Sequence, residues 1–214
     1  MTPGLATMRT PNLPNSLTLV RIFLVPLLVV VLLTKFEGHL VLGVRKELVG
    51  AAIFGLASLT DWADGYLARR RKQITTLGQL MDPLADKLLT AAAFISLVQM
   101  DLASAWIVAV IIGREFAITF LRSIAYARGI TIPASALGKT KMIAEVVAIL
   151  ALILGRDHTQ QETARQFFLL GQVALWVVLV VAVVSGVDYY RRFNRLMIRA
   201  VASGGAPPSP SSTP

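Results

Sequence analysis

Long apolar runs separated by short polar stretches dominate the chain. Six of these runs are close to the roughly 20 residues that a helix needs to cross the hydrocarbon core of a bilayer. They cover residues 17–33, 48–69, 80–98, 105–127, 137–154 and 167–189. The pattern therefore predicts an all-α, polytopic integral membrane protein with six transmembrane helices and short connections.

The composition agrees with this prediction. Of 214 residues, 55% are hydrophobic and only 15% are charged, and the mean hydropathy is +0.67. These values are too apolar for an ordinary soluble domain. Cysteine is absent, which excludes disulfides and cysteine-ligated zinc. The net charge of +9 comes from short clusters between the apolar runs, which favours anionic lipid headgroups and argues against nucleic acid as a partner.

The basic residues between the runs are distributed unevenly. If both termini are cytoplasmic, twelve of them fall on the cytoplasmic side, namely Arg9, Arg69, Arg70, Arg71, Lys72, Arg128, Lys139, Lys141, Arg191, Arg192, Arg195 and Arg199. Five fall on the opposite side, namely Lys35, Arg45, Lys46, Arg156 and Arg165. The positive-inside rule then predicts a multi-pass protein of the cytoplasmic (inner) membrane with this orientation.

The two ends differ in composition from the middle. Residues 1–16 contain prolines and the helix-capping types Asn15 and Ser16, which indicates an interfacial segment before the first span. No small-residue cleavage pattern follows the first apolar run, so we expect no cleaved signal peptide. Residues 201–214 are rich in Gly, Pro and Ser and are predicted to be a disordered tail. The six-helix domain between them covers 17–200.

Four aspartates interrupt the second and third runs. Asp61 and Asp64 are three residues apart, and Asp82 and Asp86 are four apart, so each pair lies on one face of its helix. The connection between these runs is short, which makes the two helices antiparallel neighbours whose aspartate faces can meet. Carboxylates are costly within a bilayer, by about 2.5 to 3.5 kcal/mol each near its centre. A compensating interaction is therefore expected.

Three kinds of compensation are compatible with the residues. The carboxylates can be protonated, as in a proton or ion relay, or can pair with Arg69, Lys87 or Arg114. Alternatively, they can bind two hard divalent cations, which prefer oxygen ligands. The two histidines, His39 and His158, lie in connections on the opposite side, which disfavours zinc and copper. Small residues on the aspartate faces serve either close helix packing or space for a flat ligand.

The complete spacing is D-x-x-D-G-x-x-A-R, then eight residues, then G-x-x-x-D-x-x-x-D. It resembles the signature of the CDP-alcohol phosphatidyltransferases, with no departure in residue type or spacing. The resemblance implies a dimeric six-helix membrane enzyme with two Mg²⁺ or Mn²⁺ ions and CDP-diacylglycerol as substrate. It implies metal ligands at Asp61, Asp64, Asp82 and Asp86, with Asp86 also the catalytic base. The implied CDP-binding residues are Asp64, Gly65, Ala68, Arg69, Gly78 and Asp82.

Three further segments look like the family members that use glycerol 3-phosphate as acceptor. They are PNLPNSLTLVRIFLVP, GREFAITFLRSIAYARG and GKTKMIAE, although Met142 and Glu145 depart from the pattern G-K-x-K-T-x-x-Q in the third. An acceptor that carries a phosphate dianion requires several fixed cations. The candidates for binding that phosphate are Arg114, Arg122, Lys139 and Lys141. The expected products are phosphatidylglycerophosphate and CMP.

Three alternative functions stay open at this stage, of which a structural membrane subunit is the least favoured. The same chemistry can use another acceptor, such as serine, inositol phosphate or phosphatidylglycerol. A small ion transporter, from a different class, also explains buried aspartates, but it predicts neither the small residues nor the loop length, and the chain has no paired repeats. A purely structural membrane subunit has no use for four buried carboxylates.

Overall fold

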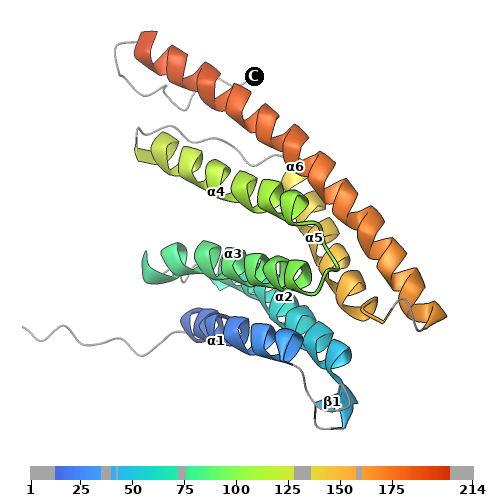
Figure 1. Cartoon of the computed structure of the whole chain (residues 1–214). Helices are drawn as coiled ribbons and strands as arrows, with labels where there is room; N and C mark the ends of the chain where they lie inside the picture. Colours follow the sequence, from blue (N-terminus) through green and yellow to red (C-terminus); the bar gives the residue numbers. More distant parts are fainter. Residues whose placement is uncertain are drawn as a thin grey trace, which may run out of the picture. The chain divides into compact units, whose positions relative to one another are not determined.

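The computed structural model describes residues 13–34, 40–41, 43–71, 76–127, 136–157 and 161–202 (Figure 1). Side chains are described for 20–34, 43–60, 87–125, 140–157 and 161–198. Within these ranges the chain forms six helices and one short hairpin. The helices are α1 (Leu13–Leu33), α2 (Lys46–Arg71), α3 (Thr76–Gln99), α4 (Ala105–Ala127), α5 (Ala136–Leu154) and α6 (Glu162–Ala202).

Each predicted apolar run lies on its own helix, which confirms a helical protein. Several helices are longer than their runs. Helix α1 begins at Leu13, inside the segment predicted to be interfacial, and α6 continues past Tyr189 to Ala202. Backbone hydrogen bonding continues a helix through polar residues, whereas apolar content marks only its most hydrophobic part. The rest of the predicted N-terminal segment, 1–12, and most of the predicted tail, 203–214, lie outside the described residues.

A hairpin between α1 and α2 was not predicted. Strands β1 (Leu40–Val41) and β2 (Val44–Arg45) pair antiparallel, with Leu40 opposite Arg45 and Val41 opposite Val44. Gly43 lies in the turn with a φ of +79°, a conformation that glycine adopts without steric cost. With two residues each, these strands are too short to give a periodic sequence signal.

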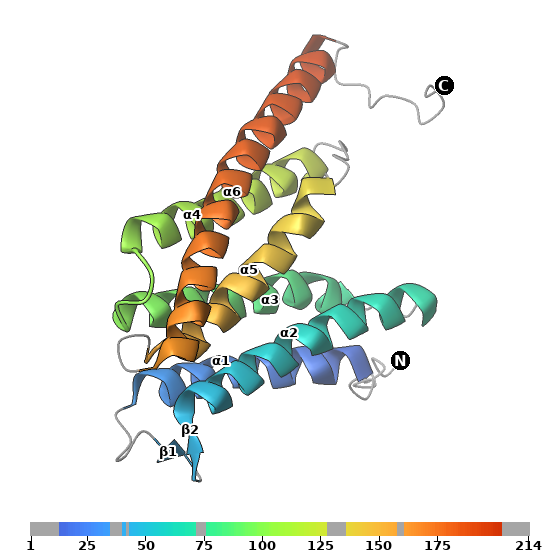
Figure 2. The same cartoon turned by 90° about the vertical axis from the view of Figure 1, so that its right-hand side faces the viewer.

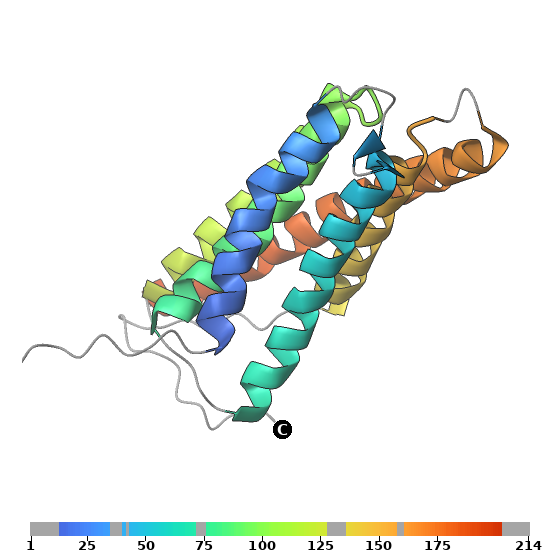
Figure 3. The ribbon, with the colours of Figure 1, turned by 90° about the horizontal axis from the view of Figure 1, so that it is seen from below.

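The chain divides into two compact units, residues 1–100 and 101–214. In the first unit, α1 packs along both α2 and α3, which run in opposite directions (Figure 3). Buried apolar side chains from all three helices form its core, namely Leu28, Leu32, Phe54, Ala57, Leu89, Phe94 and Leu97. At one end, Nζ of the buried Lys46 donates a hydrogen bond of 3.0 Å to the carbonyl oxygen of Thr34, which holds the end of α1 beside the start of α2.

In the second unit, α6 packs along α5 and also contacts α4 (Figure 2). The two helices approach closely at Gly171, where a Cβ atom would lie 2.7 Å from Cγ and 2.9 Å from the backbone nitrogen of Leu152. The core of this unit includes Ile149, Leu152, Leu175 and Val178. Trp106 and Trp176 meet edge to face with their ring centroids 5.7 Å apart, which joins α4 to α6.

Large apolar side chains are exposed on every helix. In the described part of the chain, the stretch Glu162–Ile198 of α6 is long and apolar enough to cross a membrane, and only 28% of its most apolar window is buried. Each helix exposes more than half of at least one large apolar side chain, namely Phe23, Leu56, Ile95, Phe120, Ile143 and Val173. So much exposed apolar surface is unusual for a soluble monomer.

Candidate active site

The four aspartates lie where α2 ends and α3 begins, on either side of residues 72–75. At 1.5 Å per residue, Asp64 and Asp82 are each about 10 Å from the helix ends that flank this connection. Asp61 and Asp86 are each about 15 Å from the same ends. Because the two helices run in opposite directions, the four positions form two tiers at matched depth. Their side chains lie outside the described residues, as do those of Gly65, Ala68, Arg69 and Gly78.

This donor set fits a hard divalent cation. Four aspartates at matched positions along two helices, without histidine or cysteine, carry the oxygen ligands that Mg²⁺ and Mn²⁺ prefer. Among the residues whose side chains are described, no group of three acidic, histidine or cysteine residues is arranged to hold a metal ion. The aspartates are not among those residues, so their role as ligands stays a prediction.

Two of the four predicted phosphate-binding residues come together in the second unit. Arg114 on α4 and Lys141 on α5 both donate to Oε1 of Glu115, and Lys141 also lies 2.7 Å from Oε1 of Glu145. Nη2 of Arg114 donates a hydrogen bond of 2.7 Å to Oγ of Ser185 on α6. Side chains from α4, α5 and α6 therefore meet at one place, and the two cations are balanced by two carboxylates.

This ion-pair cluster of Arg114, Glu115, Lys141, Glu145 and Ser185 is largely shielded from solvent. Lys141 is 3% exposed, Glu145 9% and Ser185 3%. Removal of one partner from such a buried ion pair strongly destabilises the folded protein, because the other charge is left uncompensated. The cluster therefore fixes the directions of Arg114 and Lys141, and its net charge is close to zero.

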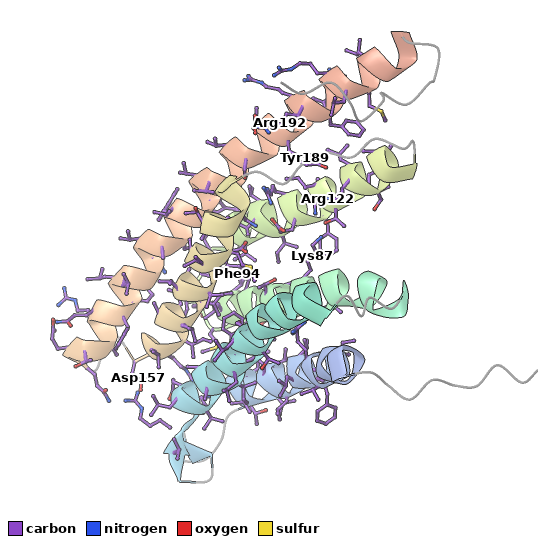
Figure 4. The ribbon with its side chains drawn as sticks, turned by 180° about the vertical axis from the view of Figure 1, so that it is seen from behind. Lys87, Phe94, Arg122, Asp157, Tyr189 and Arg192 are labelled. Atoms are coloured by element: carbon purple, nitrogen blue, oxygen red, sulfur yellow. The ribbon has the colours of Figure 1, made fainter. Side chains whose placement is uncertain are left out.

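Arg122 has different surroundings. It is exposed, about two turns from Arg114 along α4, and its guanidinium lies 6.0 Å from the centre of the Tyr189 ring (Figure 4). In the part of the chain with described side chains, it has no carboxylate partner. A cation over an aromatic face is held in place without losing its charge. Arg122 is thus available to an anion, whereas the side chain of Lys139 lies outside the described residues.

Sequence reasoning did not place three residues, Glu115, Glu145 and Ser185, in this ion-pair cluster. Lys141 and Glu145 carry a local signal, because an acidic residue four positions after a lysine on a helix lies beside it. Glu115 directly follows Arg114 in the sequence, and that adjacency is its local signal. Ser185 is separated from Arg114 by 71 positions, and its one sequence signal is a hydroxyl within the apolar part of α6.

Known proteins resemble this chain over most of its length. The family model for CDP-alcohol phosphatidyltransferase matches residues 11–184. The chain belongs to the CDP-alcohol phosphatidyltransferase family. The match includes all four aspartates and the ion-pair cluster up to Glu145, while Ser185 lies just beyond its end. Proteins of this family are associated with membranes, which agrees with the exposed apolar surface described above.

Several relatives within this family carry one name, CDP-diacylglycerol–glycerol-3-phosphate 3-phosphatidyltransferase. The protein of that name from Bacillus subtilis (strain 168) is 44% identical over 186 residues, covering 85% of this chain and 94% of its own. One from Salmonella choleraesuis is 39% identical and covers 78% and 91%, respectively. One from Rickettsia typhi is 34% identical and covers 84% and 96%. The similarity thus extends across both compact units.

Proposed function

We propose that this chain transfers the phosphatidyl group of CDP-diacylglycerol to glycerol 3-phosphate, which gives phosphatidylglycerophosphate and CMP. The observation that carries this proposal is the 44% identity over 85% of the chain to a relative named for that reaction. The eight matched positions of the motif from Asp61 to Asp86 supply the required chemistry in the same chain. The reaction is a step of phospholipid synthesis, so both the lipid substrate and the product stay in the membrane.

The four aspartates would hold two Mg²⁺ or Mn²⁺ ions. When bound, such ions neutralise the charge on the diphosphate oxygens of CDP-diacylglycerol and so stabilise the transition state. Asp64 and Asp82 also contribute to the CDP site, together with Gly65, Ala68, Arg69 and Gly78. The small residues at positions 65, 68 and 78 leave room for the nucleotide beside the helix backbone.

Asp86 acts as the general base in this proposal. It accepts the proton of the 1-hydroxyl of glycerol 3-phosphate as that oxygen attacks the phosphorus attached to diacylglycerol. The new oxygen–phosphorus bond replaces the bond to CMP, which leaves with its electron pair. No water enters the reaction, and the phosphatidyl group passes from CMP to the hydroxyl oxygen of glycerol 3-phosphate.

The phosphate of the acceptor would be bound by Arg122, Lys139, Arg114 and Lys141. Arg122 supports this role most directly, since it is exposed and keeps its full charge over the Tyr189 ring. Arg114 and Lys141 are held by Glu115 and Glu145, so they supply directed N–H donors from a cluster whose net charge is close to zero. A phosphate dianion bound here gains charge-assisted hydrogen bonds that serine or free glycerol cannot form.

We further propose six membrane spans, cytoplasmic termini and a homodimer in the inner membrane. The exposed apolar side chains on each of the six helices support lipid contact along all of them. The twelve-to-five distribution of basic residues supports the orientation. In this topology, the aspartate tiers lie about 10 to 15 Å from the cytoplasmic helix ends, where the diphosphate of a lipid with membrane-embedded acyl chains can reach them.

The test is a direct assay with purified protein. The protein is incubated with CDP-diacylglycerol, Mg²⁺ and one acceptor at a time, and the lipid product is identified by mass. We expect rapid formation of phosphatidylglycerophosphate, with glycerol, serine and inositol as poor acceptors. Faster reaction with serine, inositol phosphate or phosphatidylglycerol would refute glycerol 3-phosphate as the acceptor. It would still agree with phosphatidyl transfer from CDP-diacylglycerol. Ion flux in liposomes without any CMP release would refute the enzyme itself.

A further inference from the structure

Arg21 is a buried cation on α1 that none of the roles above uses. It is only 2% exposed, although it lies in a helix that is otherwise apolar around it. Leu28 and Leu32 are seven and eleven positions further on, so the three residues share one helical face. Both leucines are fully or almost fully buried. Because α1 packs along α2 and α3, this is the face that meets those two helices.

A hydrogen bond at the far end of α1 sets the level of Arg21 relative to α2. Lys46 Nζ donates to the Thr34 carbonyl oxygen, which places the end of α1 beside the start of α2. From that point, Arg21 lies about 20 Å along α1 and Asp61 about 22 Å along α2, at 1.5 Å per residue. Asp86 shares the depth of Asp61, as described above. Arg21 is therefore level with the deeper tier of the aspartate site.

The acidic residues on the helices that α1 meets can be counted. Helix α2 contains Glu47, Asp61 and Asp64, and α3 contains Asp82 and Asp86. Glu47 lies at the opposite end of α2, where its Oε2 is 3.7 Å from Nε of Arg45. The acidic residues of α2 and α3 near the level of Arg21 are consequently the four aspartates. A buried guanidinium in an apolar helix requires such a counter-charge.

We propose that Arg21 is a positioning residue of the four-aspartate site, whose guanidinium compensates the deeper carboxylates, Asp61 and Asp86, before divalent ions bind. This inference rests on the proposed function only in treating the aspartates as the metal site. A guanidinium keeps its charge when buried, so it can reduce the repulsion among four carboxylates without neutralising them. One positive charge against four negative ones still leaves a site that attracts two divalent ions.

The bound state gives Arg21 a second use. Two divalent ions carry four positive charges, which offset the four carboxylates. With the charge of Arg21 added, the loaded site has one net positive charge. That surplus favours a diphosphate over a neutral ligand. Arg21 thus contributes to the site whether or not ions are present, without being a ligand itself.

A double-mutant cycle on metal-free protein tests the proposal. Arg21→Met, Asp86→Asn and the double variant are purified in detergent with chelator, and their melting temperatures are compared with that of the unaltered protein. Asp86→Asn removes the charge that Arg21 compensates, so the loss in the double variant should be smaller than the sum of the single losses by about 2 to 6 °C. The matched control pairs Arg21→Met with Glu47→Gln, whose effects should add.

Two further measurements separate charge from shape. Added Mg²⁺ should raise the melting temperature of Arg21→Met more than that of the unaltered protein, because the ions replace the missing cation. Arg21→Lys keeps the charge and should melt close to the unaltered protein in chelator, which also provides a test if Arg21→Met cannot be purified. Additive losses with Asp86→Asn, or equal damage from Lys and Met, would overturn the proposal.

The outcome is independent of the catalytic assay. Coupling between Arg21 and Asp86 in a protein that lacks transferase activity would support the positioning role and refute the proposed function. Additive losses of melting temperature in a protein that has transferase activity would refute the positioning role and support the proposed function.

Discussion

Nη2 of Arg114 donates a hydrogen bond of 2.7 Å to Oγ of Ser185, and this contact joins α4 to α6 within the second unit. Ser185 is 3% exposed, and its own hydroxyl lies 3.2 Å from the carbonyl oxygen of Ala182. Glu115 accepts from the other terminal nitrogen of Arg114. The guanidinium is therefore held from two sides, which fixes its direction.

Replacing Ser185 with alanine should loosen Arg114 without removing its charge. We expect the KM for glycerol 3-phosphate to rise about threefold to tenfold, equivalent to ~1 kcal/mol, while the KM for CDP-diacylglycerol stays the same. Ser123→Ala is the control, because Ser123 is exposed and bonds only to Thr119 of its own helix. Steady-state kinetics in mixed micelles measure both constants. Equal changes in the two KM values would indicate a general packing defect.

Arg122→Ala should have a larger effect on the acceptor. Loss of a charge-assisted contact of about 1.5 to 3 kcal/mol raises the KM for glycerol 3-phosphate by about tenfold to a hundredfold. The KM for CDP-diacylglycerol should change little. Arg192→Ala is the matched control, since Arg192 pairs at 2.9 Å with Asp188 of its own helix and is half exposed. If the two variants behave alike, Arg122 does not bind the acceptor.

Substitution of the aspartates should reduce the transferase activity far more than substitution of the neighbouring basic residues. We expect Asp82→Asn and Asp86→Asn each to abolish turnover, because in the proposed site both positions supply carboxylates to the divalent ions. Lys72→Gln should retain most of the activity, since the proposal gives that residue a role in membrane orientation alone. Excess chelator should abolish the activity of the unaltered enzyme, and added Mg²⁺ or Mn²⁺ should restore that activity. Turnover that persists in chelator would rule out the metal mechanism.

Gly171 should be intolerant of any side chain. A Cβ atom there would lie within 3 Å of the Leu152 side chain and backbone nitrogen, so Gly171→Ala must push α6 away from α5. We expect the free energy of unfolding to fall by about 1 to 3 kcal/mol, measured by thermal unfolding in detergent. Gly113→Ala, where nothing lies within 4 Å, should be neutral or slightly stabilising. Equal melting temperatures for the two variants would contradict the close approach.

Membrane orientation gives a final prediction. Reporters fused after Arg9, Lys72 and Arg199 should report the cytoplasm, because the basic residues are concentrated in those connections. A reporter after Asp101, in the turn between α3 and α4, should report the opposite side. An external signal from the Lys72 fusion would put the aspartates at the wrong face for a cytoplasmic substrate.

The sequence by itself determined the helices and the content of the aspartate motif. Apolar runs near 20 residues long predict helices because only a helix satisfies its backbone hydrogen bonds in lipid, and all six runs lie on helices. The spacing of Asp61 from Asp64 and of Asp82 from Asp86 is equally local, since it depends on the helical period alone. Helix ends were less predictable, because polar residues continue α6 beyond its apolar part.

Only the tertiary structure decided which charges meet. Four cations were predicted to bind one phosphate, yet Arg114 and Lys141 share Glu115, while Arg122 lies over Tyr189. Ser185 and Arg21 gained their significance from burial and from the helices they face, which local spacing does not encode. The physical reason is that a charge in an apolar environment is stabilised by whichever partner the packing of helix faces brings within reach. That partner can lie at any distance along the chain.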